Sequence, residues 1–161
     1  PEDEDVAVGG VVLLTEINEG AEVIYHNGKY YLTYSANSYG NNTYLVAQAV
    51  SDNVLGPYRK LTEAEGGVML SGQRQGNPDV TGTGHHSFTQ SLDGQELICV
   101  YHRHCSKETF QPRLVCIDRA GFERDENGED ILSTVDDEEE FDRIADIFED
   151  ELFSEADYDV Q

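Results

Sequence analysis

Basic residues are scarce in this chain, which has 10 Lys and Arg against 33 Asp and Glu and a formal net charge of −23 at pH 7. The acidic residues concentrate at residues 2–5 and again from residue 136 to the C-terminus. A surface of this sign repels the phosphates of nucleic acids and the headgroups of anionic lipids. We therefore expect no nucleic acid and no membrane among the partners of the protein.

Long hydrophobic runs are also absent. No stretch approaches the roughly 20 apolar residues that a helix needs to span a bilayer, and no secretory signal is visible. The chain begins at Pro1 rather than at an initiator Met. We therefore expect an N-terminal part of the protein to be missing from this sequence.

Cysteine is rare and odd in number. The chain has three, Cys99, Cys105 and Cys116, and their spacing is not that of a zinc finger. A disulfide framework is therefore not expected, and reduced thiols are typical of intracellular proteins. The sequence predicts a cytoplasmic rather than a secreted protein.

Aromatic residues are present as nine Tyr and six Phe with no Trp, a composition that favours strands. Two stretches, residues 22–50 and 87–118, share one layout of strand, tight turn, strand, longer loop and strand. Asn27-Gly28 and Asp93-Gly94 suit type I′ hairpin turns, in which both central residues need φ > 0. The two turn glycines lie 66 residues apart, which indicates a repeated unit.

A unit of this size holds about four short antiparallel strands, as in one blade of a β-propeller. The sequence therefore predicts an all-β fold, with residues 1–133 forming a partial propeller of about two blades plus the remnant of a third. A β-sandwich with regularly spaced strands is the alternative that the same pattern leaves open.

The last part of the chain has a different pattern of apolar and charged residues. Phe141, Ile144, Phe148 and Leu152 recur at helical spacing among acidic residues. This pattern predicts an acidic helical tail over residues 134–161, with a narrow apolar stripe and a solvated face.

The repeat also predicts a site. Glu19 and His85 each lie nine positions before a turn glycine, so both are expected to face the central channel, where propellers bind ligands. Glycines beside them, Gly20, Gly82 and Gly84, are expected to let the backbone approach closely and to leave room for a ligand. A surface Glu and a hydrogen-bonded loop His are the plainer interpretation of these two residues.

Residues 18–36, beginning Asn-Glu-Gly-Ala-Glu-Val, resemble the third-blade motif of glycoside hydrolase family 43, usually Glu-Gly-Pro. Residues 50–58 are similar to the strand and turn that close that blade. Gly-Thr-Gly84-His85 is similar to the fourth-blade Gly-Pro-Gly-His signature of the family, and the sequences around His102 and Arg113 also fit. The resemblance covers roughly residues 8–133, the C-terminal portion of a five-bladed propeller.

The resemblance implies an inverting hydrolase that acts on arabinofuranosyl or xylosyl linkages of plant polysaccharides or oligosaccharides. Glu19 resembles its general acid, with Glu22 as the rival assignment, and Ala21 replaces the usual Pro. Arg113 and His86 are expected to bind substrate. His85 resembles the channel histidine beside a bound calcium ion, which it contacts through water.

The histidines also suggest an alternative metal. His85, His86, His102 and His104 together with Cys105 would suit zinc if three or four of them converged in space.

The general base of the family and a second, pKa-tuning Asp come from the first two blades, which this sequence lacks. The chain is therefore expected to be inactive alone and to pair with the missing N-terminal part. A non-catalytic carbohydrate-binding or β-repeat interaction module is the alternative function.

Overall fold

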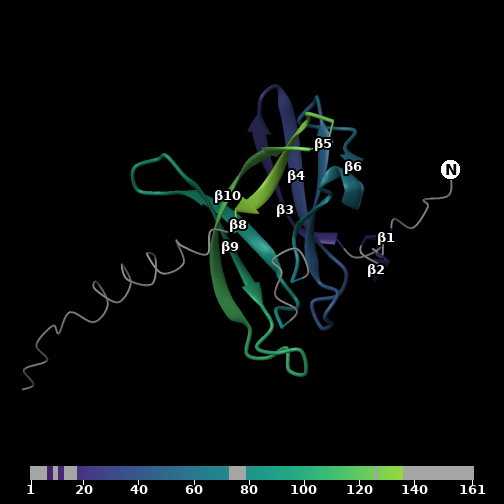
Figure 1. The fold of residues 1–161 in the computed structure, drawn as a ribbon, viewed down its shortest axis with the longest axis vertical. Coiled ribbons are helices and arrows are strands. Elements are labelled where there is room, and N and C mark those ends of the chain that lie inside the picture. Colours follow the sequence, from purple (N-terminus) through teal and green to yellow (C-terminus); the bar gives the residue numbers. More distant parts are fainter. Residues whose placement is uncertain (1–6, 9–10, 13–17, 73–78, 126, 136–161) are drawn as a thin grey trace, which may run out of the picture.

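The computed structural model describes residues 7–8, 11–12, 18–72, 79–125 and 127–135 (Figure 1). Strands form almost all of the regular structure in these ranges, and the one helix there is a single 3₁₀ turn, η1 (Glu63–Glu65). None of the helices in these ranges has the length and apolar character needed to cross a membrane. The all-β prediction is thereby confirmed, whereas the predicted helical tail beyond Val135 lies outside the described residues.

The first sheet has five antiparallel strands, and two of them are short strands that pair with the same edge of their neighbour. Its members are β3 (Asn18–His26), β4 (Lys29–Ala36), β5 (Leu45–Ser51), β6 (Arg59–Lys60) and β7 (Val68–Leu70). The order is β3-β4-β5, and both β6 and β7 pair with β5. The outer position is divided because η1 lies between β6 and β7 in the sequence.

The second sheet has four antiparallel strands in chain order. They are β8 (Gly84–Gln90), β9 (Leu97–Arg103), β10 (Leu114–Arg124) and β11 (Asp130–Val135). Two further two-residue strands, β1 (Ala7–Val8) and β2 (Val11–Val12), pair with each other. The two larger sheets correspond to the two repeat units predicted from the sequence.

The two predicted hairpin turns differ in outcome. Asn27 and Gly28 have φ values of 46° and 86°, as a type I′ turn requires, and they join β3 directly to β4. Of Asp93 and Gly94, only Gly94 has positive φ, so the type I′ prediction is wrong there. A loop of six residues joins Gln90 to Leu97, which pair with each other across the hairpin. Within this loop the Asp93 carboxylate accepts hydrogen bonds from the Ser91 hydroxyl and from the backbone N–H of Gln95.

The two sheets pack face to face over an apolar core. Val46, Met69 and Leu70 of the first sheet contact Cys99, Tyr101, Ala120 and Leu132 of the second, and all seven are buried. The first strand of one sheet, β3, contacts the first strand of the other, β8, and the outer strands β7 and β11 also meet. The first strands and the outer strands of the two sheets are thus in contact, and β8 also contacts β4 and β5.

A buried glutamine fixes the two sheets against each other. The Gln48 amide on β5 donates to the carbonyls of Gly66 (2.8 Å) and Leu132 (2.7 Å), and its oxygen accepts from the Leu132 amide at 3.2 Å. Gln48 is fully buried, so water does not replace these bonds when they are removed. Gln48 therefore sets the position of β11 relative to β5.

Replacing Gln48 by Leu is expected to lower the free energy of unfolding by about 1–3 kcal/mol, because it leaves buried backbone groups of Gly66 and Leu132 unsatisfied. The midpoint of urea denaturation measures this loss. Gln95→Leu, on an exposed loop, is the matched control and should leave the midpoint unchanged. Equal midpoints for the two variants would show that the inter-sheet bonds contribute nothing.

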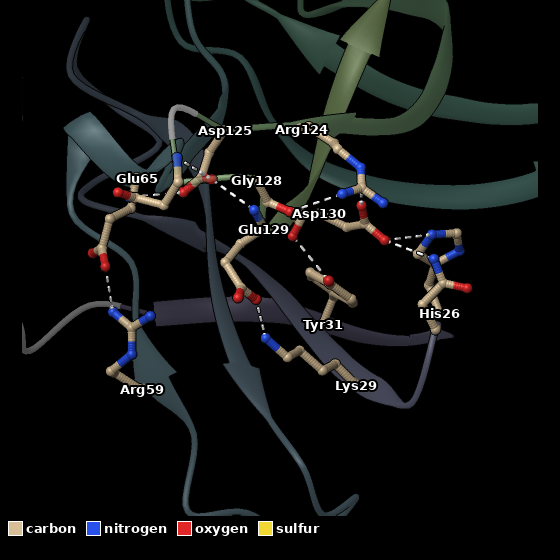
Figure 2. Close-up of polar contacts among 12 residues, drawn as sticks. His26, Lys29, Tyr31, Arg59, Glu65, Arg124, Asp125, Gly128, Glu129 and Asp130 are labelled. Carbon is tan, nitrogen blue, oxygen red and sulfur yellow. Dashed lines mark hydrogen bonds and ion pairs between the residues drawn. The ribbon is translucent and has the colours of Figure 1, made fainter.

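Hydrogen bonds and ion pairs near the turn between β3 and β4 also join the two sheets (Figure 2). The Asp130 carboxylate accepts from the Asn27 amide at 2.7 Å and lies 3.2 Å from Nε2 of His26. These contacts, led by the Asn27 hydrogen bond and helped by Arg124, hold the pKa of Asp130 below its usual value. His26 is at the opposite end of β3 from Glu19, so this polar cluster fixes the sheets away from the predicted site.

All three cysteines are free, as predicted. Cys99 is buried in the inter-sheet core, and burial raises the pKa of its thiol to about 12. Cys99 is therefore a packing residue rather than a nucleophile at neutral pH. The cytoplasmic location stays a prediction.

Candidate active site

Glu19 lies near the N-terminal end of β3, where a β-bulge interrupts the pairing with β4. The bulge falls between Glu19 and Glu22, and Gly20 adopts φ = 59° within it. The side chain of Glu19 is 42% exposed. Bulges redirect side chains at strand ends, and here the result is a carboxyl group that is anchored at one oxygen and open to solvent.

The anchor of Glu19 is the hydroxyl of Tyr44, which donates to Oε1 at 2.6 Å. Tyr44 precedes β5 and is buried, and its burial and the Glu19 bond raise the pKa of the phenol to about 12. Tyr44 therefore remains a hydrogen-bond donor at every pH at which the protein is expected to work. No sequence motif marks Tyr44 as a site residue, although it directly precedes the strand that follows the loop.

The structure brings Glu19 and His85 together, as predicted. Nδ1 of His85 lies 3.9 Å from Oε1 of Glu19. His85 stands in a second bulge, between Gly84 and Ser87 of β8, and its amide donates to the Ser35 hydroxyl at 2.7 Å. Because Ser35 lies opposite Glu19 on β4, this bond carries His85 to the same end of the first sheet.

The repeat positions of the two residues differ by one from the predicted match. In the strand register Glu19 corresponds to Gly84, and Gly20 corresponds to His85. Both Gly20 and His85 have positive φ, at 59° and 51° respectively. Counting back from the turn glycines gave a different match because the loop before Gly94 is longer than the turn before Gly28. Adjacent bulge positions nevertheless place both side chains at one end of the sheets.

The glycines before His85 accommodate neighbouring rings rather than a ligand. A Cβ atom on Gly84 would lie 2.1 Å from the Tyr44 ring, and one on Gly82 would lie 2.2 Å from the His104 ring. Gly82 also has φ = 64°, which disfavours other residues. The expectation that these glycines leave room for a ligand is therefore wrong.

His102 and Arg113 form the next part of the site. Nδ1 of His102 lies 2.6 Å from the Gly84 carbonyl and therefore carries the proton, which leaves Nε2 to accept from the Arg113 guanidinium at 2.8 Å. Burial and the nearby Arg113 lower the pKa of His102 to about 4, so the ring is neutral. Arg113 also lies over the Tyr39 ring at 5.6 Å, so its exposed side chain is held in place.

An open groove of about 650 Å³ lies beside these residues. His85, His102 and Arg113 line it together with several residues of β8, β9 and β10 and the loop before β10. The lining contains hydrogen-bond donors and no carboxylate among the described residues. This set suits a ligand rich in hydroxyl groups. Glu19 is not among the lining residues, but its Oε1 lies 3.9 Å from Nδ1 of His85, which is one of them.

His86 lies away from this groove. Its ring is buried between the sheets, where Nε2 is 2.7 Å from the Thr33 hydroxyl and Nδ1 has no hydrogen-bond partner among the residues that the structure describes. Burial lowers the pKa of His86 to about 4, so the ring is neutral. The bulge at His85 turns successive side chains of β8 to different faces, and it is His85 that faces outward. This position gives no support to the prediction that His86 binds substrate.

The rival carboxylate, Glu22, is engaged elsewhere. Its Oε2 accepts from the Phe88 amide at 3.0 Å and so links β3 to β8. Glu19 is therefore the better candidate for a proton donor.

Metal binding finds little support in the described part of the chain, which holds no group of three His, Cys, Asp or Glu side chains able to bind a metal ion. The zinc alternative needs such a group. His85 alone does not provide the oxygen ligands that calcium requires, so no chemical step is assigned to calcium.

The chain is similar to several known proteins. Residues 4–127 match the family described as "Glycosyl hydrolases family 43". A β-D-galactofuranosidase (xynD) from Aspergillus niger is 37% identical over 107 residues, which are 65% of this chain and 28% of that protein. An extracellular exo-α-(1→5)-L-arabinofuranosidase from Streptomyces avermitilis is 37% identical over 89 residues, or 54% of this chain and 18% of that protein.

Solved structures show the same likeness. A thermostable family-43 glycoside hydrolase is 42% identical with a TM-score of 0.60, over 73% of this chain and 35% of that one. An endo-1,4-β-xylanase from Bacteroides thetaiotaomicron is 30% identical with a TM-score of 0.55, over 75% of this chain and 38% of that one. The chain thus spans less than two fifths of these relatives. Since the family match covers most of its length, the chain belongs to glycoside hydrolase family 43.

Proposed function

We propose that this chain supplies the general acid and part of the sugar-binding surface of an inverting glycosidase that acts on arabinofuranosyl or xylosyl linkages. The observation that carries the proposal is the Glu19 carboxyl group, which is anchored at Oε1 by Tyr44 and lies near a groove that contains Arg113. The furanosidase names of both curated relatives favour furanosides over xylosides as the first substrates to test.

In this proposal the two sheets are successive blades of a five-bladed propeller. The support is their arrangement, with β3 beside β8 and β7 beside β11, which is the order expected of neighbouring blades around an axis. Glu19 and His85 then lie at the axial end of the blades. The remaining blades belong to the part of the relatives that this chain does not span.

The proposed chemistry is a single displacement. Protonated Glu19 gives its proton to the glycosidic oxygen as the bond to the anomeric carbon breaks, and a second carboxylate takes a proton from the attacking water. Inverting enzymes keep these two carboxyl groups roughly 6.5–9.5 Å apart so that water fits between them. The second carboxylate is assigned to the missing blades, since the described groove lining provides none.

Arg113 is proposed to bind the sugar. Its guanidinium is fixed by His102 on one side and by the Tyr39 ring on the other, so it can donate to hydroxyl groups without a large loss of side-chain entropy.

The test is hydrolysis by a protein in which the remaining blades of the proposed propeller are joined to this chain, called the longer protein below. We expect release of nitrophenol from nitrophenyl α-L-arabinofuranoside or β-D-xyloside, with NMR showing a product of inverted anomeric configuration. A galactofuranoside in the same assay tests the other furanose named among the relatives. Sugar binding without turnover would support the binding-module alternative, and retention of configuration would contradict the mechanism.

A further inference from the structure

The hydrogen bond by which Tyr44 anchors Glu19 bears on where the acidic proton of Glu19 resides. Its hydroxyl donates to Oε1 of Glu19 at 2.6 Å, while the residue itself is 2% exposed. This bond fixes one oxygen of a half-exposed carboxyl group, while the other, Oε2, makes no hydrogen bond with the described residues.

The position of Tyr44 is determined from several sides. Its ring occupies the space where a Cβ of residue 84 would stand, and the His102 ring packs edge-on at 5.8 Å. The preceding loop is held by a bond of 2.8 Å from the Asn37 amide to the Thr43 carbonyl. A donor held in this way keeps its geometry while the charge on Glu19 changes.

We propose that Tyr44 is a positioning residue that restricts the transferable proton of Glu19 to Oε2. When Oε1 accepts from Tyr44, the acidic proton sits on Oε2 and points to the leaving oxygen. The O–H bond of Glu19 then breaks, a new O–H bond forms on the leaving group, and the electron pair of the broken C–O bond stays on that oxygen. Tyr44 keeps its own proton throughout. This inference rests on the proposed role of Glu19 as general acid.

The Tyr44 bond also strengthens as the reaction proceeds. A hydrogen bond to a carboxylate is stronger than one to a neutral carboxyl group, so the donor stabilises Glu19 more after proton transfer than before it. The benefit therefore falls on the step in which the leaving group is protonated and not on substrate binding.

The test is Tyr44→Phe in the longer protein, with aryl glycosides of different leaving-group acidity. For saccharide leaving groups, which need protonation, we expect kcat to fall roughly 10- to 100-fold with KM little changed. For a dinitrophenyl leaving group, which departs without a proton, kcat should stay within about two-fold of the parent, since protonation contributes little there. Equal losses on both substrates, or a large rise in KM, would overturn the positioning role.

Tyr25→Phe is the matched control, because it removes the same hydroxyl from an exposed ring on the same sheet, near the other end of β3. It should change neither kcat nor its leaving-group dependence. Circular dichroism and the urea midpoint show whether both variants remain folded.

A second readout does not depend on turnover. The short hydrogen bond predicts a downfield, slowly exchanging hydroxyl proton in the NMR spectrum, which is lost in Tyr44→Phe and moves upfield in Glu19→Gln, where the acceptor is neutral. If this resonance is absent, the Tyr44 contact and the inference fail. If it is present in a protein that hydrolyses no glycoside, the Tyr44 contact exists but the proposed function is wrong, and the positioning role is then wrong as well.

Discussion

Replacing Glu19 by Gln is expected to lower kcat of the longer protein on saccharide substrates by roughly 100- to 10,000-fold, which is the range typical of a lost general acid. The amide still accepts the Tyr44 hydrogen bond, so the local structure should be kept. What it cannot do is give a proton to the leaving oxygen. Initial rates on an arabinofuranosyl oligosaccharide, with KM determined separately, measure the effect.

Glu22→Gln is the control for this prediction. Glu22 lies on the same strand, and its role is to accept a bond from the Phe88 amide, which the Gln carbonyl can also do. We expect its kcat within a few-fold of the parent. Loss of activity in Glu22→Gln with full activity in Glu19→Gln would reverse the assignment of the acid.

Residues 1–161 alone are expected to show a hydrolysis rate near background. In the proposed mechanism Glu19 protonates the leaving group, but a second carboxylate has to activate water, and that group is assigned to blades outside this chain. Loss of a general base costs roughly another 100- to 10,000-fold. Nitrophenol release by the purified chain from pH 5 to 8, compared with the longer protein at equal molar concentration, tests this.

The purified chain should also gain activity if the missing blades are added as a separate polypeptide. Robust turnover by residues 1–161 alone, abolished by Glu19→Gln, would mean that the chain holds a base of its own. In that case the assignment of the base to other blades would be wrong.

The strands were predictable because their signals are local. The aromatic and β-branched composition of β4 and β9 and the Asn27-Gly28 turn depend on neighbouring residues only. The nearness of Glu19 and His85 was predictable from the repeat, which places similar positions of two sheets at one end. The predicted offset was nevertheless one residue out, because side-chain bonds within the loop at Asp93 lengthen the second hairpin.

The rest of the site depends on contacts between distant residues. Tyr44 meets Glu19 only after β5 has paired with β4, and Gly84 has to be glycine only because the Tyr44 ring lies against it. His86 is next to an exposed histidine in sequence, yet the bulge in β8 buries it. No pattern in the sequence specifies which residue of a bulge faces inward, so such positions were beyond prediction.

The dependence of kcat on leaving-group acidity tests the central claim, that Glu19 is the general acid, most directly. For the parent longer protein, kcat should vary little among dinitrophenyl, nitrophenyl and saccharide leaving groups, because Glu19 protonates each as it departs. For Glu19→Gln, kcat should fall steeply as the leaving group becomes more basic and approach the parent value with dinitrophenol. A Glu19→Gln protein that loses activity equally on all three would contradict the account.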